Sequence, residues 1–210
     1  ELVLPYIPYA RQDRIPKRGE ALSIKVFANL LNTLNYPTVS VLDPHSDVST
    51  ALINNVHVIH QWEIWGYELI KLNAEDKLDK FDLIAPDAGA LKKIFNLQEY
   101  VKLSRCDYIR TGTKHRDVET GAITGTTVDG TPHNKVGIIV DDICDGGRTF
   151  IELGKILKGQ YDKLILCVTH GIFSNGFDLL FEQFDEIYTT NSWSGKLQSF
   201  DKLIVNNIIQ

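Results

Sequence analysis

The feature of this sequence that most constrains its fold is the run Val-Gly-Ile-Ile-Val at positions 136–140. No position in the run carries a polar side chain, whereas a strand with one solvated face alternates apolar and polar residues. A run of this kind is typical of a parallel strand that helices cover on both faces. We therefore expect an α/β protein whose sheets are mainly parallel and flanked by helices.

The rest of the chain repeats the order strand, loop, helix. A junction near 79–81 interrupts this alternation, which then begins again, so we expect two lobes, 1–78 and 79–210. An apolar strand opens the chain without a lead-in and no methionine is present, so we expect a fragment whose first lobe is cut short at its start. The expected strands are 3–6, 38–42, 56–59, 81–85, 100–103, 135–140 and 164–168, and the expected helices are 20–34, 62–70, 89–95 and 149–157.

Composition excludes several classes of protein. The net charge of −5 argues against a nucleic-acid partner, which needs a basic face. The three cysteines are too few and too scattered for a disulfide framework or a zinc site, and they fit a reducing compartment. No apolar run approaches the ~18 residues needed to cross a bilayer. We therefore expect a soluble cytoplasmic protein with no nucleic-acid and no membrane partner.

The strongest motif directly follows the apolar run. Asp141 and Asp142 come at its carboxyl end, where ligands bind in parallel sheets. Gly146 and Gly147 then form a turn into a helix near Thr149, and the N–H groups of such a turn suit a phosphate. The paired acids can hold the 2- and 3-hydroxyls of a ribose, or a Mg²⁺ bound to them. The alternative is a polar turn with solvated carboxylates, but acids followed by glycines and a helix favour a binding site.

Residues Asp141–Thr149 resemble the PRPP-binding loop that phosphoribosyltransferases share with ribose-phosphate diphosphokinases, the PRPP synthetases. Four further segments, 8–14, 42–46, 85–89 and 169–174, resemble the synthetases alone and follow in the same order. The resemblance implies two similar lobes of type I phosphoribosyltransferase fold. It also implies an enzyme that transfers diphosphate from ATP to the anomeric hydroxyl of ribose 5-phosphate, with Mg²⁺ as cofactor, giving PRPP and AMP.

The resemblance assigns two groups of residues to the phosphate and ribose side of the reaction. Asp141, Asp142, Asp145, Gly146, Gly147, Arg148 and Thr149 are expected to bind the ribose and its phosphate. Lys114 and Arg116 lie in a long polar segment, 110–134, that we expect to be a loop acting as a lid. They would stabilise the charge that develops on the transferred phosphoryl group and on AMP. The alternative for this pair is a solvent-exposed basic turn.

ATP and magnesium are assigned to other segments. Arg11, Gln12, Asp13 and His45 are expected to bind ATP, and His45 and Asp87 the Mg²⁺. Arg11 follows a strand, and a guanidinium can stack on a purine or bind phosphates. The alternatives are a charged surface loop at 11–13, a structural hydrogen bond from His45, and a helix cap at Asp87. His170 is expected to line the edge of the site.

The phosphate loop departs from the family pattern Asp-Thr-x-Gly-Thr at Gly146 and Arg148. A missing side chain at 146 is expected to open space beside the phosphate, and the arginine offers a fork for a second phosphate. Both changes suit ADP-ribose as acceptor, giving ADP-ribose diphosphate in a phage pathway that rebuilds NAD, with the protein then in the host cytoplasm. The alternative is neutral drift, with ribose 5-phosphate still the acceptor.

The resemblance also concerns partners. It implies a homo-oligomer, a dimer or a hexamer of dimers, in which a neighbouring chain completes the ATP site. One rival is a phosphoribosyltransferase, but that class shares only the 140–149 loop. A rival of another class is a catalytically inactive regulatory subunit that associates with the synthetase. Such a protein is expected to have lost the loop cations or the paired acids, and this chain keeps both.

Overall fold

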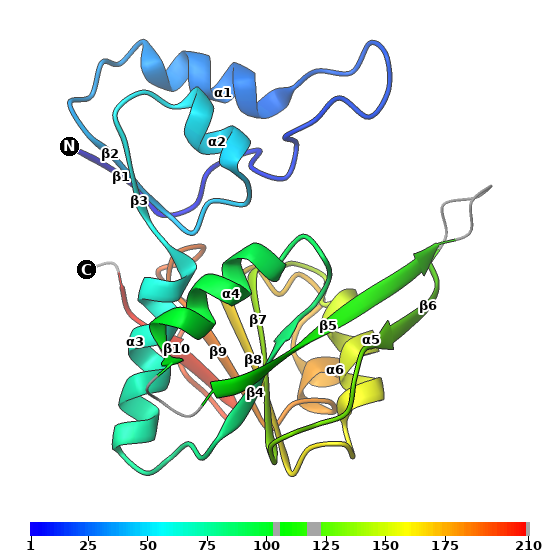
Figure 1. The fold of residues 1–210 in the computed structure, drawn as a ribbon. Helices are drawn as coiled ribbons and strands as arrows, with labels where there is room; N and C mark the ends of the chain where they lie inside the picture. Colours follow the sequence, from blue (N-terminus) through cyan, green and yellow to red (C-terminus); the bar gives the residue numbers. More distant parts are fainter. Residues whose placement is uncertain (103–105, 117–122, 209–210) are drawn as a thin grey trace. The chain divides into compact units, whose positions relative to one another are not determined.

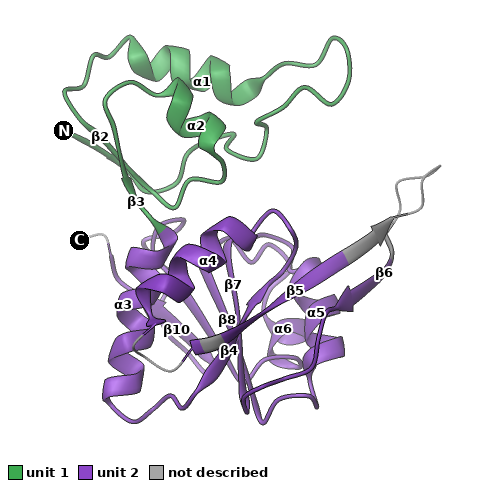
Figure 2. Ribbon diagram, in the orientation of Figure 1, with its two compact units in different colours: residues 1–60, 209 green, residues 61–208, 210 purple. Residues whose placement is uncertain are grey.

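The computed structural model describes residues 1–102, 106–116 and 123–208, and within this part the chain forms two compact units. The first comprises Glu1–His60 and the second Gln61–Ile208 (Figure 2). We expected the division near 79–81. It falls earlier because α3 (Gln61–Ala74) packs within the second unit: Trp65 is fully buried there, and its Nε1 donates to Thr169 Oγ1 at 3.1 Å. The assignment of 1–78 and 79–210 as domains stays a prediction.

The first unit contains a three-stranded parallel sheet in the order β1-β2-β3 (Figure 1). These strands are Leu2–Leu4, Val39–Leu42 and Val56–Ile59, and the helices are α1 (Ser23–Asn32) and α2 (Asp47–Leu52). Helix α1 buries Ile24, Ala28 and Leu31, which lie on one face because they are four and three residues apart. They pack with Val39 and Val41 of the central strand in the core of this unit.

The second unit is built on a seven-stranded sheet in the order β10-β9-β8-β7-β4-β5-β6. Every pairing in it is parallel except that of β5 with β6. The strands are β4 Phe81–Ala85, β5 Cys106–Arg116, β6 Ile123–Val128, β7 Val136–Cys144, β8 Lys163–Gly171, β9 Glu186–Thr190 and β10 Leu203–Asn206. The remaining helices are α4 Leu91–Tyr100, α5 Arg148–Leu157 and α6 Asp178–Phe181.

Helices cover both faces of this sheet, as the continuous apolar run predicted. Ile138 and Val140 of β7 pack in one core cluster with residues of α3 and α4. Ile139 points to the other face and packs in a second cluster with residues of α5 and α6 (Figure 1). Successive side chains of a strand point to opposite faces, so a strand between two helical layers must be apolar at every position.

Two predicted elements are wrong. The expected strand at 100–103 is not formed at 100, where α4 ends, nor at 101–102, and residue 103 lies outside the described residues. The next described strand, β5, begins at Cys106. The described part of the expected loop at 110–134 is largely strand. Beyond its last pair with β4, β5 continues and pairs with β6 in an antiparallel ribbon, from Gly112 opposite Val128 to Arg116 opposite Ile123 (Figure 1). Its threonines and glycines suggested a loop, but threonine is β-branched and suits a strand equally well.

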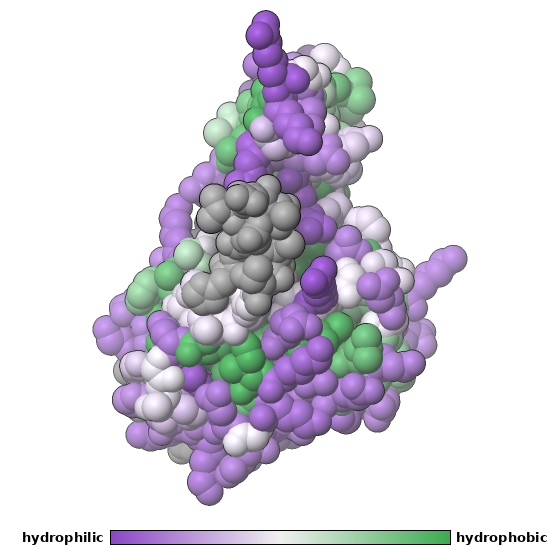
Figure 3. All heavy atoms as spheres, turned by 90° about the vertical axis from the view of Figure 1, so that its right-hand side faces the viewer, coloured by the Kyte–Doolittle hydropathy of each residue, from purple (hydrophilic) through white to green (hydrophobic). Residues whose placement is uncertain are grey.

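The described part of the chain has no helix that is both long and apolar enough to cross a membrane. The face drawn in Figure 3 is mainly hydrophilic and carries scattered apolar patches. In the first unit the exposed apolar side chains include Val26 and Leu30, which lie on α1, and Leu34, which follows this helix.

Candidate active site

The acid pair lies near the carboxyl end of β7, as expected, but the strand continues past the expected end at 140. The strand runs to Cys144, and Asp141 pairs in register with Val168 of β8. Asp141 is partly buried, and its Oδ1 accepts a hydrogen bond from the Asp142 N–H at 2.9 Å. Asp142 is only 6% exposed and points to the α4 side of the sheet, where its Oδ2 is 3.5 Å from Lys93 Nζ. The two acids therefore lie in different surroundings, and Asp142 is not a solvated carboxylate.

The electrostatics of this strand end favour a cation or a hydrogen-bond donor. Burial raises the pKa of the Asp141 carboxyl well above its ordinary value of 3.8, and the nearby charges of Asp142 and Asp87 raise this pKa further. Three acidic side chains thus act on one another at the carboxyl ends of β4 and β7. A bound cation, or hydroxyls that donate to Asp141, would stabilise its ionised form.

The turn after β7 is shaped by Gly147, which has a φ of +75° and directly precedes α5. Glycine adopts this left-handed conformation without steric cost. Three successive carbonyls before it accept hydrogen bonds from the segment after β8: Cys144 O from Ile172 N (2.8 Å), Asp145 O from Ser174 N (3.1 Å), and Gly146 O from Asn175 Nδ2 (3.1 Å). In a trans peptide the next N–H points opposite to the carbonyl. The N–H groups of 145–147 therefore face away from that segment, as an anion-binding turn requires.

Asp87 follows β4 and caps the next turn. Its Oδ1 accepts hydrogen bonds from Gly89 N at 3.0 Å and from Ala90 N at 3.3 Å. These bonds hold the turn before α4, which begins at Leu91 with Ala90 as its N-cap and without a side-chain cap hydrogen bond, so Asp87 does not cap the helix itself. A carboxylate has about four lone-pair positions, so a cap does not prevent the same side chain from binding a cation.

The first unit carries the residues expected to bind ATP. Arg11 and Gln12 are exposed, and Oδ1 of Asp13 lies 4.0 Å from Nε of the exposed Arg14. His45 is partly buried and follows Asp43, which is 1% exposed and has a φ of +34°. The charged-loop alternative at 11–13 and the binding interpretation are both compatible with this geometry, so the ATP role stays a prediction.

Comparison with known proteins adds an independent observation. No model of a known protein family matches the chain. The chain is, however, 31% identical over 201 residues to the ribose-phosphate pyrophosphokinase of Pyrococcus furiosus, a match that covers 91% of the chain and 66% of that protein. The chain belongs to the ribose-phosphate pyrophosphokinase family.

Further pyrophosphokinases match over most of the chain. The protein of Mycoplasmopsis pulmonis is 31% identical (91% of the chain, 58% of the relative) and that of Mycoplasma genitalium 32% (88% and 54%). The phosphoribosylpyrophosphate synthetase of Mycobacterium smegmatis has the same fold, with a TM-score of 0.81 at 23% identity over 98% of this chain and 66% of that one. The α/β fold and the family resemblance are thus confirmed, and the chain spans between about half and two thirds of the length of these proteins.

Of the residues predicted to form the site, the structure brings together the acid pair and the turn 145–149, but not every predicted residue can be placed. The backbones of Lys114 and Arg116 lie in the part of β5 that pairs with β6, and their side chains lie outside the described residues. Arg148 is exposed and is the first residue of α5, one position before the expected start. The assigned roles of all these residues stay predictions.

Sequence reasoning missed Lys93 and misplaced His170. Lys93 was not assigned to the site, yet it is the ion-pair partner of Asp142, and the only signal was its position on a helix beside the strand end. His170 does not line an open edge: it is 2% exposed, and its Nδ1 is 2.7 Å from Ser192 Oγ. Ser192 Oγ also donates to Thr169 O at 3.1 Å, so this network holds the end of β8.

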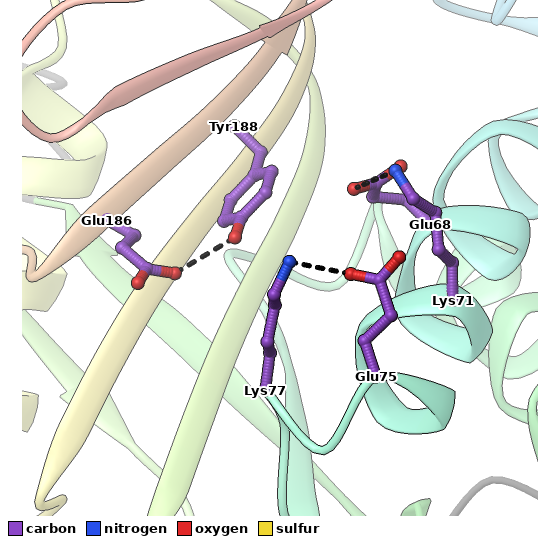
Figure 4. A network of polar contacts seen from close by, with 6 residues as sticks. All are labelled: Glu68, Lys71, Glu75, Lys77, Glu186 and Tyr188. Carbon is purple, nitrogen blue, oxygen red and sulfur yellow. Dashed lines mark hydrogen bonds and ion pairs between the residues drawn. The ribbon is translucent and has the colours of Figure 1, made fainter.

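A second group of polar and charged residues lies elsewhere in the second unit, on α3, the segment after it and β9 (Figure 4). Tyr188 donates to Glu186 Oε2 at 3.0 Å, and Lys163 contacts Glu186 Oε1 at 2.7 Å. Lys163 and Glu186 are the first residues of β8 and β9, whereas the acid pair is near the end of the parallel strand β7. Lys163 and Glu186 therefore lie at the opposite end of the strands from the acid pair, where their ion pair links β8 to β9.

Proposed function

We propose that this chain transfers diphosphate from ATP to the anomeric hydroxyl of ribose 5-phosphate in the presence of Mg²⁺, giving PRPP and AMP. One observation carries the proposal: an acid pair and a glycine turn stand at the carboxyl end of β7, in a chain 31% identical to a ribose-phosphate pyrophosphokinase over 91% of its length. Because the chain covers 66% of that relative, the activity is inferred for this chain and not carried over from it.

In this proposal Asp141 accepts hydrogen bonds from ribose hydroxyls. It is partly buried, and hydroxyl donors would offset the burial that raises its pKa. Asp142, held by Lys93, keeps the strand end in place and adds negative charge. The N–H groups of the turn 145–149, together with the N-terminus of α5, bind the 5-phosphate.

The transfer itself is an in-line displacement. The anomeric oxygen forms a bond to the β-phosphorus of ATP. The bond from that phosphorus to the oxygen that bridges it to the α-phosphorus breaks, and AMP leaves with the electron pair. The proton of the anomeric hydroxyl passes to solvent water. Lys114 and Arg116 stabilise the charge that develops on the transferred group and on AMP. Arg11, Gln12, Asp13 and His45 of the first unit bind the nucleotide.

Mg²⁺ would be held by Asp87 and His45 together with phosphate oxygens, and it would neutralise phosphate charge. Mg²⁺ is normally bound through one or two carboxylates, substrate phosphates and water, without an all-protein cage. The mutual repulsion of Asp141, Asp142 and Asp87 also favours a cation nearby.

The test is release of AMP from ATP. We expect release only when ribose 5-phosphate and Mg²⁺ are both present, and loss of release in an Asp141→Ala variant. An Asp162→Ala variant is the matched control, because that acid is 72% exposed and lies after α5. A chain that binds a pyrophosphokinase but never releases AMP would instead be a regulatory subunit. The expected homo-oligomer, with the ATP site completed by a neighbouring chain, is tested by sedimentation in the same buffer.

A second acceptor, ADP-ribose, is favoured by one observation: Arg148 is exposed at the first residue of α5, beside the proposed phosphate turn. The other argument for it fails, because the space beside Gly146 is not open. A Cβ at 146 would lie 3.0 Å from Asn175 Nδ2. Comparing AMP release with each acceptor decides the question. A preference for ribose 5-phosphate, or an Arg148→Gly variant with unchanged selectivity, argues for neutral drift.

A further inference from the structure

Asn175 contacts the proposed phosphate turn in a way that the sequence motifs did not indicate. It lies two residues before Phe177, in the exposed segment between β8 and α6, far in sequence from the turn. Its Nδ2 donates to Gly146 O at 3.1 Å. The backbone beside it is held as well, since Ser174 N donates to Asp145 O at 3.1 Å. The side chain therefore extends an ordered contact between the two segments by one residue.

This hydrogen bond fixes one peptide plane of the turn. Gly146 O and Gly147 N–H belong to the same trans peptide and point in opposite directions. Glycine on both sides of the plane leaves its rotation weakly restrained, because neither residue has a Cβ. An amide that holds Gly146 O in place consequently aims the Gly147 N–H away from Asn175, at the side where the turn can bind an anion.

The same amide explains why position 146 carries no side chain. A Cβ added there would stand 3.0 Å from Asn175 Nδ2, and the other close atoms, Asn175 Cγ and Ser174 Oγ, are at 3.8 and 3.9 Å. No left-handed φ requires glycine at 146, in contrast to 147. The crowded atom is the end of an exposed side chain, so a methyl group at 146 would displace the amide by a few tenths of an ångström and weaken its hydrogen bond.

We propose that Asn175 is a positioning residue for phosphate binding: its amide orients the Gly146–Gly147 peptide so that the Gly147 N–H donates to the 5-phosphate of the acceptor. The inference rests on the proposed function, because the phosphate belongs to the ribose phosphate named there. Asn175 does not need to touch the phosphate, and the glycine at 146 is the partner that makes room for its amide.

The experiment is a double-mutant cycle on the full 210-residue chain, read by calorimetric titration with ribose 5-phosphate. Asn175→Gly removes the amide, and Gly146→Ala displaces it. Each should weaken binding by about three- to ten-fold, as expected for one hydrogen bond that orders a donor. The double variant should be no weaker than Asn175→Gly alone, because both substitutions act on the same contact. Gly195→Ala is the matched control, since a Cβ there meets no atom within 4 Å.

A spectroscopic readout separates positioning from a general structural effect. In ¹H–¹⁵N spectra the Gly147 amide signal should shift on addition of ribose 5-phosphate, and this shift should shrink in both single variants while the thermal midpoint stays near that of the wild-type chain. Additive losses in the cycle, or unchanged affinity in Asn175→Gly, overturn the inference alone. A wild-type chain that does not bind ribose 5-phosphate overturns the proposed function, and the inference with it.

Discussion

At the residue scale, the ion pair between Lys93 and Asp142 stabilises the carboxyl end of β7. The two side chains are 24% and 9% exposed, and the distance from Nζ to Oδ2 is 3.5 Å. Removing one partner of a buried pair leaves the other charge poorly solvated, which is more costly than removing both. Lys93→Ala should therefore lower the free energy of unfolding by about 1–3 kcal/mol.

Urea unfolding measures this loss, and the neighbouring Lys92 offers a control because its side chain is exposed on the same helix. Lys92→Ala should change the free energy of unfolding by no more than about 0.5 kcal/mol. A double variant, Lys93→Ala with Asp142→Asn, should recover part of the loss. If Lys92→Ala and Lys93→Ala have equal effects, the pair does not stabilise the strand end.

Asp141 gives a prediction for the pH dependence of stability. Its pKa in the folded chain is raised above the ordinary value of 3.8 by burial and by neighbouring acids. A raised folded pKa favours the protonated form, so the contribution of this group is present below pH 3.8 and is lost as pH rises through the folded pKa. Asp141→Asn removes that dependence. Unfolding curves should therefore show the variant gaining stability relative to the wild-type chain as pH rises from 4 to 7, and a constant difference would contradict the raised pKa.

At the element scale, the β5–β6 ribbon replaces the expected loop as the carrier of the proposed catalytic cations. Lys114→Ala and Arg116→Ala should each lower turnover by about 10²–10³ with little change in stability, because cations that stabilise a developing charge act mainly in the transition state. AMP release and urea unfolding on the same preparations check both parts. Lys155→Ala, an exposed residue of α5 paired with Glu152, serves as control. Near-normal turnover in both ribbon variants would remove them from the site.

Elements differ in how far the sequence predicts them, and the reason is physical. The strand at 136–140 was predictable because a strand without polar residues is stable only where helices cover both of its faces. The ribbon was not, because threonine and glycine occur in loops and in strands alike, and pairing of β5 with β6 is a tertiary outcome. The site shows the same division. The acid pair and glycine turn form one local motif, whereas Lys93 and Asn175 reach it from distant segments.

At the scale of the whole chain, the boundary between the units depends on contacts that no local pattern shows. Trp65 of α3 donates a hydrogen bond to Thr169, which lies 104 residues later in the sequence, and α3 therefore packs in the second unit. That unit has two core clusters of its own, one on each face of its sheet. A unit with its own hydrophobic core can fold independently.

This division leads to a prediction about truncation. The residues proposed to bind ribose and its phosphate lie in the second unit, as does the positioning residue Asn175; the binding residues are Asp141, Asp142 and 145–149. Arg11, Gln12, Asp13 and His45 lie in the first unit. A chain of residues 61–208 should therefore fold cooperatively and bind ribose 5-phosphate within a few-fold of the full chain, yet release no AMP from ATP. Circular dichroism, calorimetry and the AMP assay measure the three properties. A folded truncated chain that has lost ribose 5-phosphate binding would mean that the first unit contributes to the phosphate site, and the assignment of that site to the 145–149 turn would then be incomplete.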